Sequence, residues 1–194
     1  SGEAILLFEV DGNRDSVEWE GLKIKEITSQ RAGQVEWATE PKRMADLWEG
    51  RSVVATAAAR VRPDGTRVFA GEDISVPLSK IAETLRQIRA LGAKHGIKVV
   101  NYGHIGDGNV HTAPVIDPDK PDEVEKAKLL VNDIHLLAIS LGGTTTGEHG
   151  VGAVRSMYAE LEHGAAVQIM RKIKKTLDPK GIMNPGKVFL PEEE

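Results

Sequence analysis

The chain has 194 residues, a net charge of −4 and no cysteine. This length suits one large domain or two small packed halves. Apolar residues make up 40% of the chain and charged residues 28%, as in an ordinary globular protein. Because there is no basic excess to neutralise phosphates, we do not expect nucleic acid as a partner. The absence of cysteine excludes disulfides, thiolate metal ligands and iron–sulfur ligation.

Neither a membrane span nor a secretory signal is predicted. The longest apolar runs, such as Ala4–Phe8, are far shorter than the roughly 20 residues that cross a bilayer. Ser1-Gly2 in place of an initiator Met resembles a cleavage scar, and strand-like sequence follows at once. We therefore expect a piece of a longer protein. The expected location is the cytoplasm, with peripheral attachment of the whole protein to a membrane as the alternative.

Strands and helices alternate along the chain. Apolar and β-branched runs between turn-forming residues predict extended segments at Ala4–Val10, Gln34–Thr39, Arg67–Val76, Ile97–Tyr102 and Val110–Ile116. Helical periodicity and end signals predict helices at Asp15–Arg31, from Pro41 past Arg51 towards Arg60, from Pro77 to His95, at Val124–Leu141 and at Ala165–Leu177.

The connections indicate the fold class. Several of them are hairpin-like and no strand is apolar throughout, which favours a half-exposed antiparallel sheet over a doubly wound parallel sheet. We predict an α+β, ferredoxin-like fold in which helices back the sheet. Two similar halves, residues 1–97 and 98–194, would meet near Ile97.

A glycine-rich run, Gly103–His111, carries two histidines. Asp107-Gly108 is a strong two-residue hairpin signal, and such a turn would pair His104 with His111. Directly opposed residues have Cβ atoms about 4.5–5.5 Å apart. Two imidazoles at that separation can bind one metal ion through bonds of about 2.0–2.1 Å. Asp107 and Asn109 are expected in the turn or behind the ligands.

A second glycine-rich segment, Gly147–Gly150, adds a carboxylate and another imidazole. Glu148 is the natural third ligand, which gives a His/His/Glu set with an open coordination position. In an extended backbone His149 points to the opposite face, where an acid or base beside the metal would lie. Two alternatives stay open at this point: the histidines stabilise a plain hairpin, or Glu148-His149 belongs to a surface loop.

Three runs of residues, in order and at matching spacings, resemble the C-terminal domain of the FAD-linked oxidases. This family includes D-lactate dehydrogenases, the flavin subunit of glycolate oxidase and D-2-hydroxyglutarate dehydrogenase. The runs are Gly103–His111, Gly142–Gly152 and Leu177–Phe189, and shorter stretches at Leu47–Arg51 and Asp73–Pro77 also correspond. The resemblance covers essentially the whole chain.

The resemblance implies a cap over a flavin, with FAD held mainly by an N-terminal domain that this chain lacks. It implies that His104, His111 and Glu148 bind a divalent metal, usually zinc, that His149 is the catalytic base, and that Arg51 grips the substrate carboxylate. Arg155 is a second candidate near the substrate or the reduced flavin. Residues that bind the FAD are not identified. An electron-transfer protein and a second copy of the chain are further candidate partners.

The substrate expectation rests on departures from the family. Where 2-hydroxyglutarate-type members carry further polar groups, this chain has Ala55, Gly71 and Ala113. This favours a small D-2-hydroxy acid, such as D-lactate or glycolate, which the whole protein would oxidise to the 2-oxo acid with hydride transfer to FAD. The alternatives are a metal-dependent hydrolase that uses the His/His/Glu set and a non-catalytic structural domain.

Overall fold

A computed structural model describes residues 4–67 and 73–189. The chain forms two compact units, Ser1–Val53 and Val54–Glu194. This boundary differs from the expected halves 1–97 and 98–194, and the similarity of those halves stays a prediction. Gly71 and part of the predicted extended segment Arg67–Val76 lie outside the described residues.

The described part of the first unit contains two helices, both at predicted places, but the helix predicted from Pro41 towards Arg60 ends at Ser52 and a separate short helix follows at Val54–Ala58. α1 spans Arg14–Ser29 and begins at Asn13, whose side-chain oxygen accepts a hydrogen bond from Ser16 N at 3.0 Å. α2 spans Pro41–Ser52 and has its proline in the first turn, where the missing N–H costs nothing.

The strands predicted for this unit at Ala4–Val10 and Gln34–Thr39 are wrong. Neither segment is assigned to a strand, and the apolar side chains of the first are exposed, Ile5 to 95%. A strand needs a neighbour for its backbone N–H and C=O groups. The part of this unit that the structure describes holds no strand to provide one.

The second unit is built on an antiparallel sheet around one long strand, β4 (Asn109–Ile116). β3 (Lys98–Tyr102) pairs with β4 from His111 to Val115. β1 (Thr66–Arg67) pairs with the C-terminal end of β4, and β2 (Ile74–Ser75) pairs with its N-terminal end. The predicted strands Ile97–Tyr102 and Val110–Ile116 are therefore confirmed. The described part of the predicted extended segment Arg67–Val76 contains two-residue strands that pair with opposite ends of β4.

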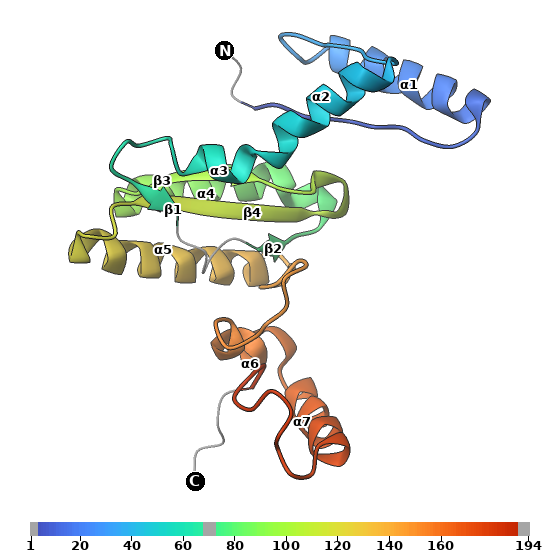
Figure 1. The fold of residues 1–194 in the computed structure, drawn as a ribbon. Coiled ribbons are helices and arrows are strands. Elements are labelled where there is room, and N and C mark those ends of the chain that lie inside the picture. Colours follow the sequence, from blue (N-terminus) through green and yellow to red (C-terminus); the bar gives the residue numbers. More distant parts are fainter. Residues whose placement is uncertain (1–3, 68–72, 190–194) are drawn as a thin grey trace. The chain divides into compact units, whose positions relative to one another are not determined.

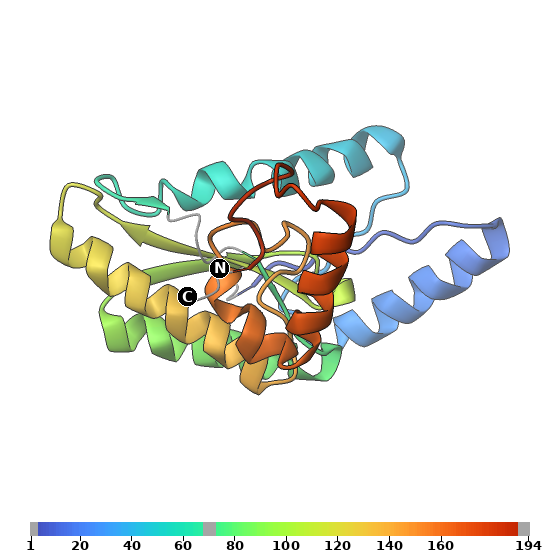
Figure 2. The same ribbon diagram turned by 90° about the horizontal axis from the view of Figure 1, so that it is seen from below.

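Two helices, α4 (Ile81–His95) and α5 (Pro121–Ser140), pack against each other and against this sheet (Figures 1 and 2). α4 follows the 3-10 turn η2 (Leu78–Lys80) and ends at Gly96, which adopts a left-handed conformation with φ of 68°. The shared core includes Ile74, Ile88, Val110, Leu130 and Ile134, all fully buried. This arrangement confirms the α+β prediction of an antiparallel sheet backed by helices.

Short elements complete the second unit: α3 (Val54–Ala58), η3 (Ile105–Asp107), η4 (Ser156–Tyr158), α6 (Ala159–His163) and α7 (Ala166–Leu177). α7 ends at Asp178, whose carboxylate accepts hydrogen bonds from Ile182 N at 3.1 Å and Met183 N at 2.9 Å. His135 is fully buried on α5 against the Tyr158 ring. Within the described ranges, no helix is both long and apolar enough to cross a membrane.

Candidate functional site

The run between β3 and β4 forms a longer loop than the predicted two-residue hairpin. The register pairs His111 with Tyr102, not with His104. The loop contains η3 and the left-handed Gly108, whose φ is 87°. Gly108 is also pressed against the Val76 carbonyl, so that no Cβ fits there. The predicted turn type is therefore wrong, because packing against the end of β2 rather than the local turn propensity shapes the loop.

The two histidines nevertheless lie close together. His104 precedes η3, and its ring centroid lies 5.8 Å from that of His111 in an edge-to-face arrangement. The His111 ring also lies 5.3 Å from the Tyr102 ring, and Tyr102 Oη accepts a hydrogen bond from Arg67 at 2.7 Å. His111 is buried and His104 is exposed.

Strand pairing explains why Asp73 joins this group. β2 pairs Ile74 with Val110 and Ser75 with Asn109. Continuing this register by one residue places Asp73 opposite His111. Side chains alternate along a strand, so the apolar Ile74 and Val110 enter the core while Asp73 and His111 share the other face.

The Glu148 carboxylate lies among three imidazoles. Its Oε1 is 3.0 Å from His111 Nε2, 3.4 Å from His149 Nε2 and 3.9 Å from His104 Nε2. The rings of His149 and His111 are stacked, with centroids 5.2 Å apart and planes inclined by 7°. The side chains of Glu148, His149 and His104 are each about half exposed, so small molecules can reach the group from solvent.

Asp73 fixes the segment that carries Glu148 and His149. It is fully buried, and its carboxylate accepts hydrogen bonds from the backbone amides of Glu148 and His149 at 3.0 and 2.7 Å. The Asn109 side-chain amide and the Thr146 hydroxyl donate two more, at 2.7 and 3.2 Å. Burial by itself would raise the pKa of Asp73, but these hydrogen bonds, led by that of the His149 amide, outweigh burial and lower the pKa.

Gly147 permits this close approach. A Cβ atom there would overlap the Asn109 side chain and would lie 2.7 Å from Ser75 Oγ and 2.8 Å from Asp73 Oδ1. The need for glycine at this position is therefore steric, since its φ does not lie in the left-handed region.

Further contacts hold the rest of this loop. Thr144 forms a β-bridge with Ser75. Thr145 donates through its amide at 3.0 Å and its hydroxyl at 2.8 Å to the carboxylate of Glu162 on α6. Arg155, only 7% exposed, donates to the Gly150 carbonyl at 3.1 Å. Residues 144, 145 and 150 of this loop are thus each held by a contact with another part of the chain.

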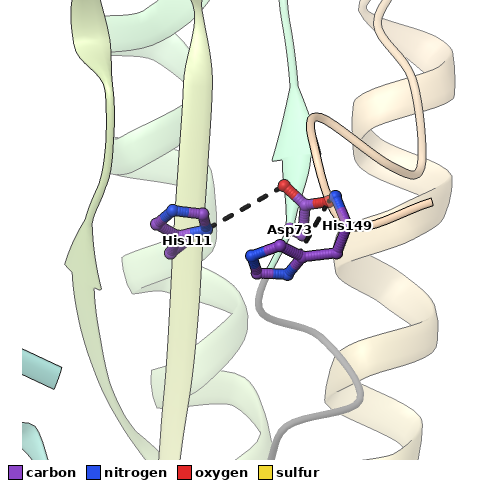
Figure 3. Close-up of side chains that lie close together, drawn as sticks. All are labelled: Asp73, His111 and His149. Carbon is purple, nitrogen blue, oxygen red and sulfur yellow. Dashed lines mark hydrogen bonds and ion pairs between the residues drawn. The ribbon is translucent and has the colours of Figure 1, made fainter.

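Two overlapping groups of side chains could hold a cation. His104, His111 and Glu148 offer ligand atoms that all lie within 4.8 Å of one another, and so do Asp73, His111 and His149. Figure 3 shows the second group, with the Asp73 carboxylate beside both histidine rings. Imidazole nitrogens and a carboxylate oxygen are the donors that suit zinc. In the first group two of the three ligands, His104 and Glu148, are open to solvent, whereas His111 is buried.

The other predicted site residues are placed as follows. Arg51 lies in the last turn of α2, in the first unit. Asp107 accepts a hydrogen bond from the Asn109 amide at 3.0 Å, which shapes the loop.

Asp73 and Tyr102 were missed as site residues. Asp73 stands directly before a short strand, and only its pairing partner reveals its role.

Comparisons with known proteins identify the family. The family described as "FAD linked oxidases, C-terminal domain" matches residues 1–188. The glycolate oxidase subunit GlcD of Bacillus subtilis (strain 168) is 37% identical over 191 residues, which are 97% of this chain and 40% of that protein. The probable mitochondrial D-lactate dehydrogenase of Danio rerio is 33% identical over 186 residues, which are 95% of this chain and 37% of that protein.

The chain therefore belongs to the family of FAD linked oxidases, as their C-terminal domain. It spans about 40% or less of the length of these curated relatives. Among solved structures, 4-ethylphenol oxidase from Gulosibacter chungangensis matches with a TM-score of 0.65 and 20% identity, over 93% of this chain and 38% of that chain. A likeness at this identity concerns the fold alone.

Proposed function

We propose that this chain is the substrate- and metal-binding domain of a flavin-dependent dehydrogenase that oxidises a small D-2-hydroxy acid to the 2-oxo acid. The observation that carries the proposal is the convergence of His104, His111 and Glu148 within 4.8 Å in a half-exposed group. The names of the relatives, glycolate oxidase and D-lactate dehydrogenase, support the substrate class. FAD, bound mainly outside this chain, would accept the hydride.

The donor set fits zinc. Three protein ligands, two of them imidazoles, leave one position of a tetrahedral site for a substrate oxygen. A bound divalent ion would supply Lewis-acid polarisation of the substrate hydroxyl and would lower its pKa. His104, His111 and Glu148 would hold the ion, and the exposed side of the group would admit the acid.

His149 is the proposed base for the hydroxyl proton. Its Nδ1 lies 3.9 Å from the buried Asp73 carboxylate, which favours the tautomer with the proton on Nδ1. Nε2 then keeps a free lone pair on the side that faces Glu148, where the substrate would bind. The ring is half exposed and can release the proton to solvent.

Small side chains at two positions favour a small substrate. Ala113, fully buried, follows His111 by two positions and therefore points to the same face of β4. Ala55 lines a hollow together with Thr56, Ala59, Thr66 and Arg67. Neither alanine can hydrogen-bond a second carboxylate, so a monocarboxylate such as D-lactate or glycolate is preferred.

Two arginines, Arg51 and Arg155, are proposed to interact with the substrate. Arg51 is proposed to hold its carboxylate through a bidentate pair, an assignment that rests on the family resemblance. In the full-length flavoprotein, Arg51→Lys should raise KM for the hydroxy acid because lysine cannot form the two parallel bonds. Arg155 donates to the carbonyl of Gly150, the residue after His149, and from that position would add positive charge near the substrate.

Calorimetric titration of zinc into the metal-stripped chain tests the site. The chain should bind one zinc, and His111→Ala should abolish the binding. His163→Ala is the matched control, because His163 lies on α6 outside both candidate groups. Equal binding by wild type and His111→Ala would reject the metal site.

The full-length flavoprotein tests the reaction. Flavin reduction should follow addition of D-lactate or glycolate, and His149→Ala should abolish reduction while zinc stays bound. Near-normal flavin reduction by this variant would reject His149 as the base.

A further inference from the structure

We propose that Asp73 is a positioning residue whose buried carboxylate sets the place of Glu148 and the orientation of the His111 and His149 rings. This inference rests on the metal site proposed above. It assigns a role to a residue that lies outside the proposed set His104, His111 and Glu148.

Four hydrogen-bond donors surround the Asp73 carboxylate. Asp73 is fully buried and accepts from two backbone amides, one side-chain amide and one hydroxyl, which come from β4 and from residues 146–149. A buried carboxylate is stable only when its oxygens are hydrogen-bonded. The consecutive amides of Glu148 and His149 point inward at Asp73, which leaves the Glu148 side chain on the outer side.

The same carboxylate lies beside both histidine rings. Asp73 Oδ1 is 3.9 Å from His111 Nδ1, and Oδ2 is 3.9 Å from His149 Nδ1 (Figure 3). In each ring it is the other nitrogen, Nε2, that lies near Glu148, at 3.0 and 3.4 Å. One carboxylate therefore faces the Nδ1 side of two stacked rings and leaves Nε2 for the metal and for the proton.

Asp73 is poorly suited to be a metal ligand itself. Its two oxygens already accept from four groups, and no part of the side chain reaches solvent. A carboxylate that binds metal needs lone pairs free for the ion and a path by which the ion enters. Glu148, half exposed, meets the second requirement.

The experiment compares Asp73→Asn with Asp178→Asn. Both variants remove the charge from a buried aspartate that accepts two backbone amides, but Asp178 does so at the end of α7. Hydrogen exchange of individual amides is measured by NMR in the metal-free chain, and zinc affinity is measured by calorimetry. Asparagine keeps the shape of the side chain but turns an NH2 group towards the N–H donors.

We expect Asp73→Asn to speed exchange of the Glu148 and His149 amides by about tenfold or more, the effect of losing a hydrogen bond to a charged acceptor. The β4 amides should stay protected. The zinc dissociation constant should rise by about 10- to 100-fold, as for other groups that orient metal ligands. Asp178→Asn should leave zinc affinity and both amides unchanged.

Each other outcome has a defined meaning. Unchanged exchange at Glu148 and His149 in Asp73→Asn overturns the proposal. If the wild-type chain binds no zinc, the metal site fails, and the exchange data still decide the role of Asp73. If His104→Ala keeps full zinc affinity while Asp73→Asn loses it, Asp73 is a ligand and not a positioning residue.

A milder variant covers the case in which Asp73→Asn does not fold. Thr146→Val removes one donor to Asp73 and leaves the carboxylate in place. It should speed exchange of the same two amides by a smaller factor, about two- to fivefold. Exchange rates equal to those of the wild type would overturn the proposal.

Discussion

The two segments that carry the site are held in place by different kinds of contact. In residues 103–111 local bonds shape the turn: the His104 carbonyl accepts from the Asp107 and Asn109 amides, each at 3.2 Å, and the β3–β4 ladder closes the loop. One bond from outside, from the Val76 amide to the Gly108 carbonyl at 3.1 Å, ties this loop to the end of β2. In residues 144–150 the main anchors are carboxylates distant in sequence, Asp73 and Glu162. The conformation of a segment held by side chains distant in sequence depends on the correct folding of those distant parts. The conformation of a segment held by neighbouring residues depends on them much less.

Gly108→Ala should have the largest effect on stability, because Gly108, in the loop of residues 103–111 (the local loop), packs against Val76 at the end of β2. Its φ of 87° strains alanine, and the new Cβ would press on the Val76 carbonyl. We expect a loss of about 2–3 kcal/mol in the free energy of unfolding, combining left-handed strain and overpacking. Urea denaturation measures it. A loss below about 0.5 kcal/mol, the range of ordinary surface changes, would contradict the packing argument.

Gly147→Ala tests the distant anchors in the same way. The added Cβ would displace the Asn109 and Asp73 side chains, which should cost about 1–3 kcal/mol and weaken zinc binding. Gly106→Ala is the matched control in the local loop, since nothing lies within 4 Å of its Cβ position and its φ is not positive. Similar stability and zinc affinity in the two variants would remove the contrast between the segments.

Glu162→Gln should cost less, about 1 kcal/mol at pH 7, because both Thr145 hydrogen bonds go to one oxygen and the amide oxygen of glutamine can still accept them, so that only the charge of the acceptor is lost. Burial alone would raise the pKa of Glu162, but the hydrogen bonds of Thr144 and Thr145 lower it overall. A lowered pKa gives stability that is present above the unfolded-state pKa of about 4.3 and lost as the pH falls through the folded-state value.

The difference in melting temperature between wild type and Glu162→Gln should therefore be full at pH 7 and shrink below about pH 4. Melting curves followed by circular dichroism from pH 3 to pH 7 measure it. A difference that grows as the pH falls would show that the Glu162 charge does not stabilise the loop.

Asp107→Ala should have the smallest effect. Asp107 is exposed and gives the local loop a single side-chain hydrogen bond, to the Asn109 amide. We expect a loss of about 0.5–1 kcal/mol and a change in zinc affinity of less than about threefold. A tenfold loss of affinity would mean that the local loop, like the distant anchors, controls the ligands.

The same contrast explains what could be predicted from the sequence. Helices α1, α4, α5 and α7 follow from their own periodicity and end signals, and β3 and β4 follow from their bounding turns. The grouping of His104, His111 and Glu148 was predicted from residue type, glycine content and family resemblance. These are properties of short stretches, which a single sequence displays directly.

What could not be predicted depends on pairing between distant segments. Asp73 lies beside His111 because β2 pairs with β4. The residues near Asp73 in the sequence do not indicate the register of that pairing. The hairpin was assigned the wrong turn because the contact of Gly108 with Val76 is non-local. Ala4–Val10 has strand-like residues but lacks the neighbour that would make it a strand.

That exposed segment has a practical consequence for anyone who handles this chain alone. Residues Ala4–Phe8 are apolar, uncharged and free of proline, and Ile5 is almost completely accessible. Such a stretch pairs readily with the same stretch of another molecule and seeds ordered aggregates. At the high concentrations used for calorimetry these five residues outside the site therefore favour aggregation, and a single lysine among them should raise the solubility of the chain.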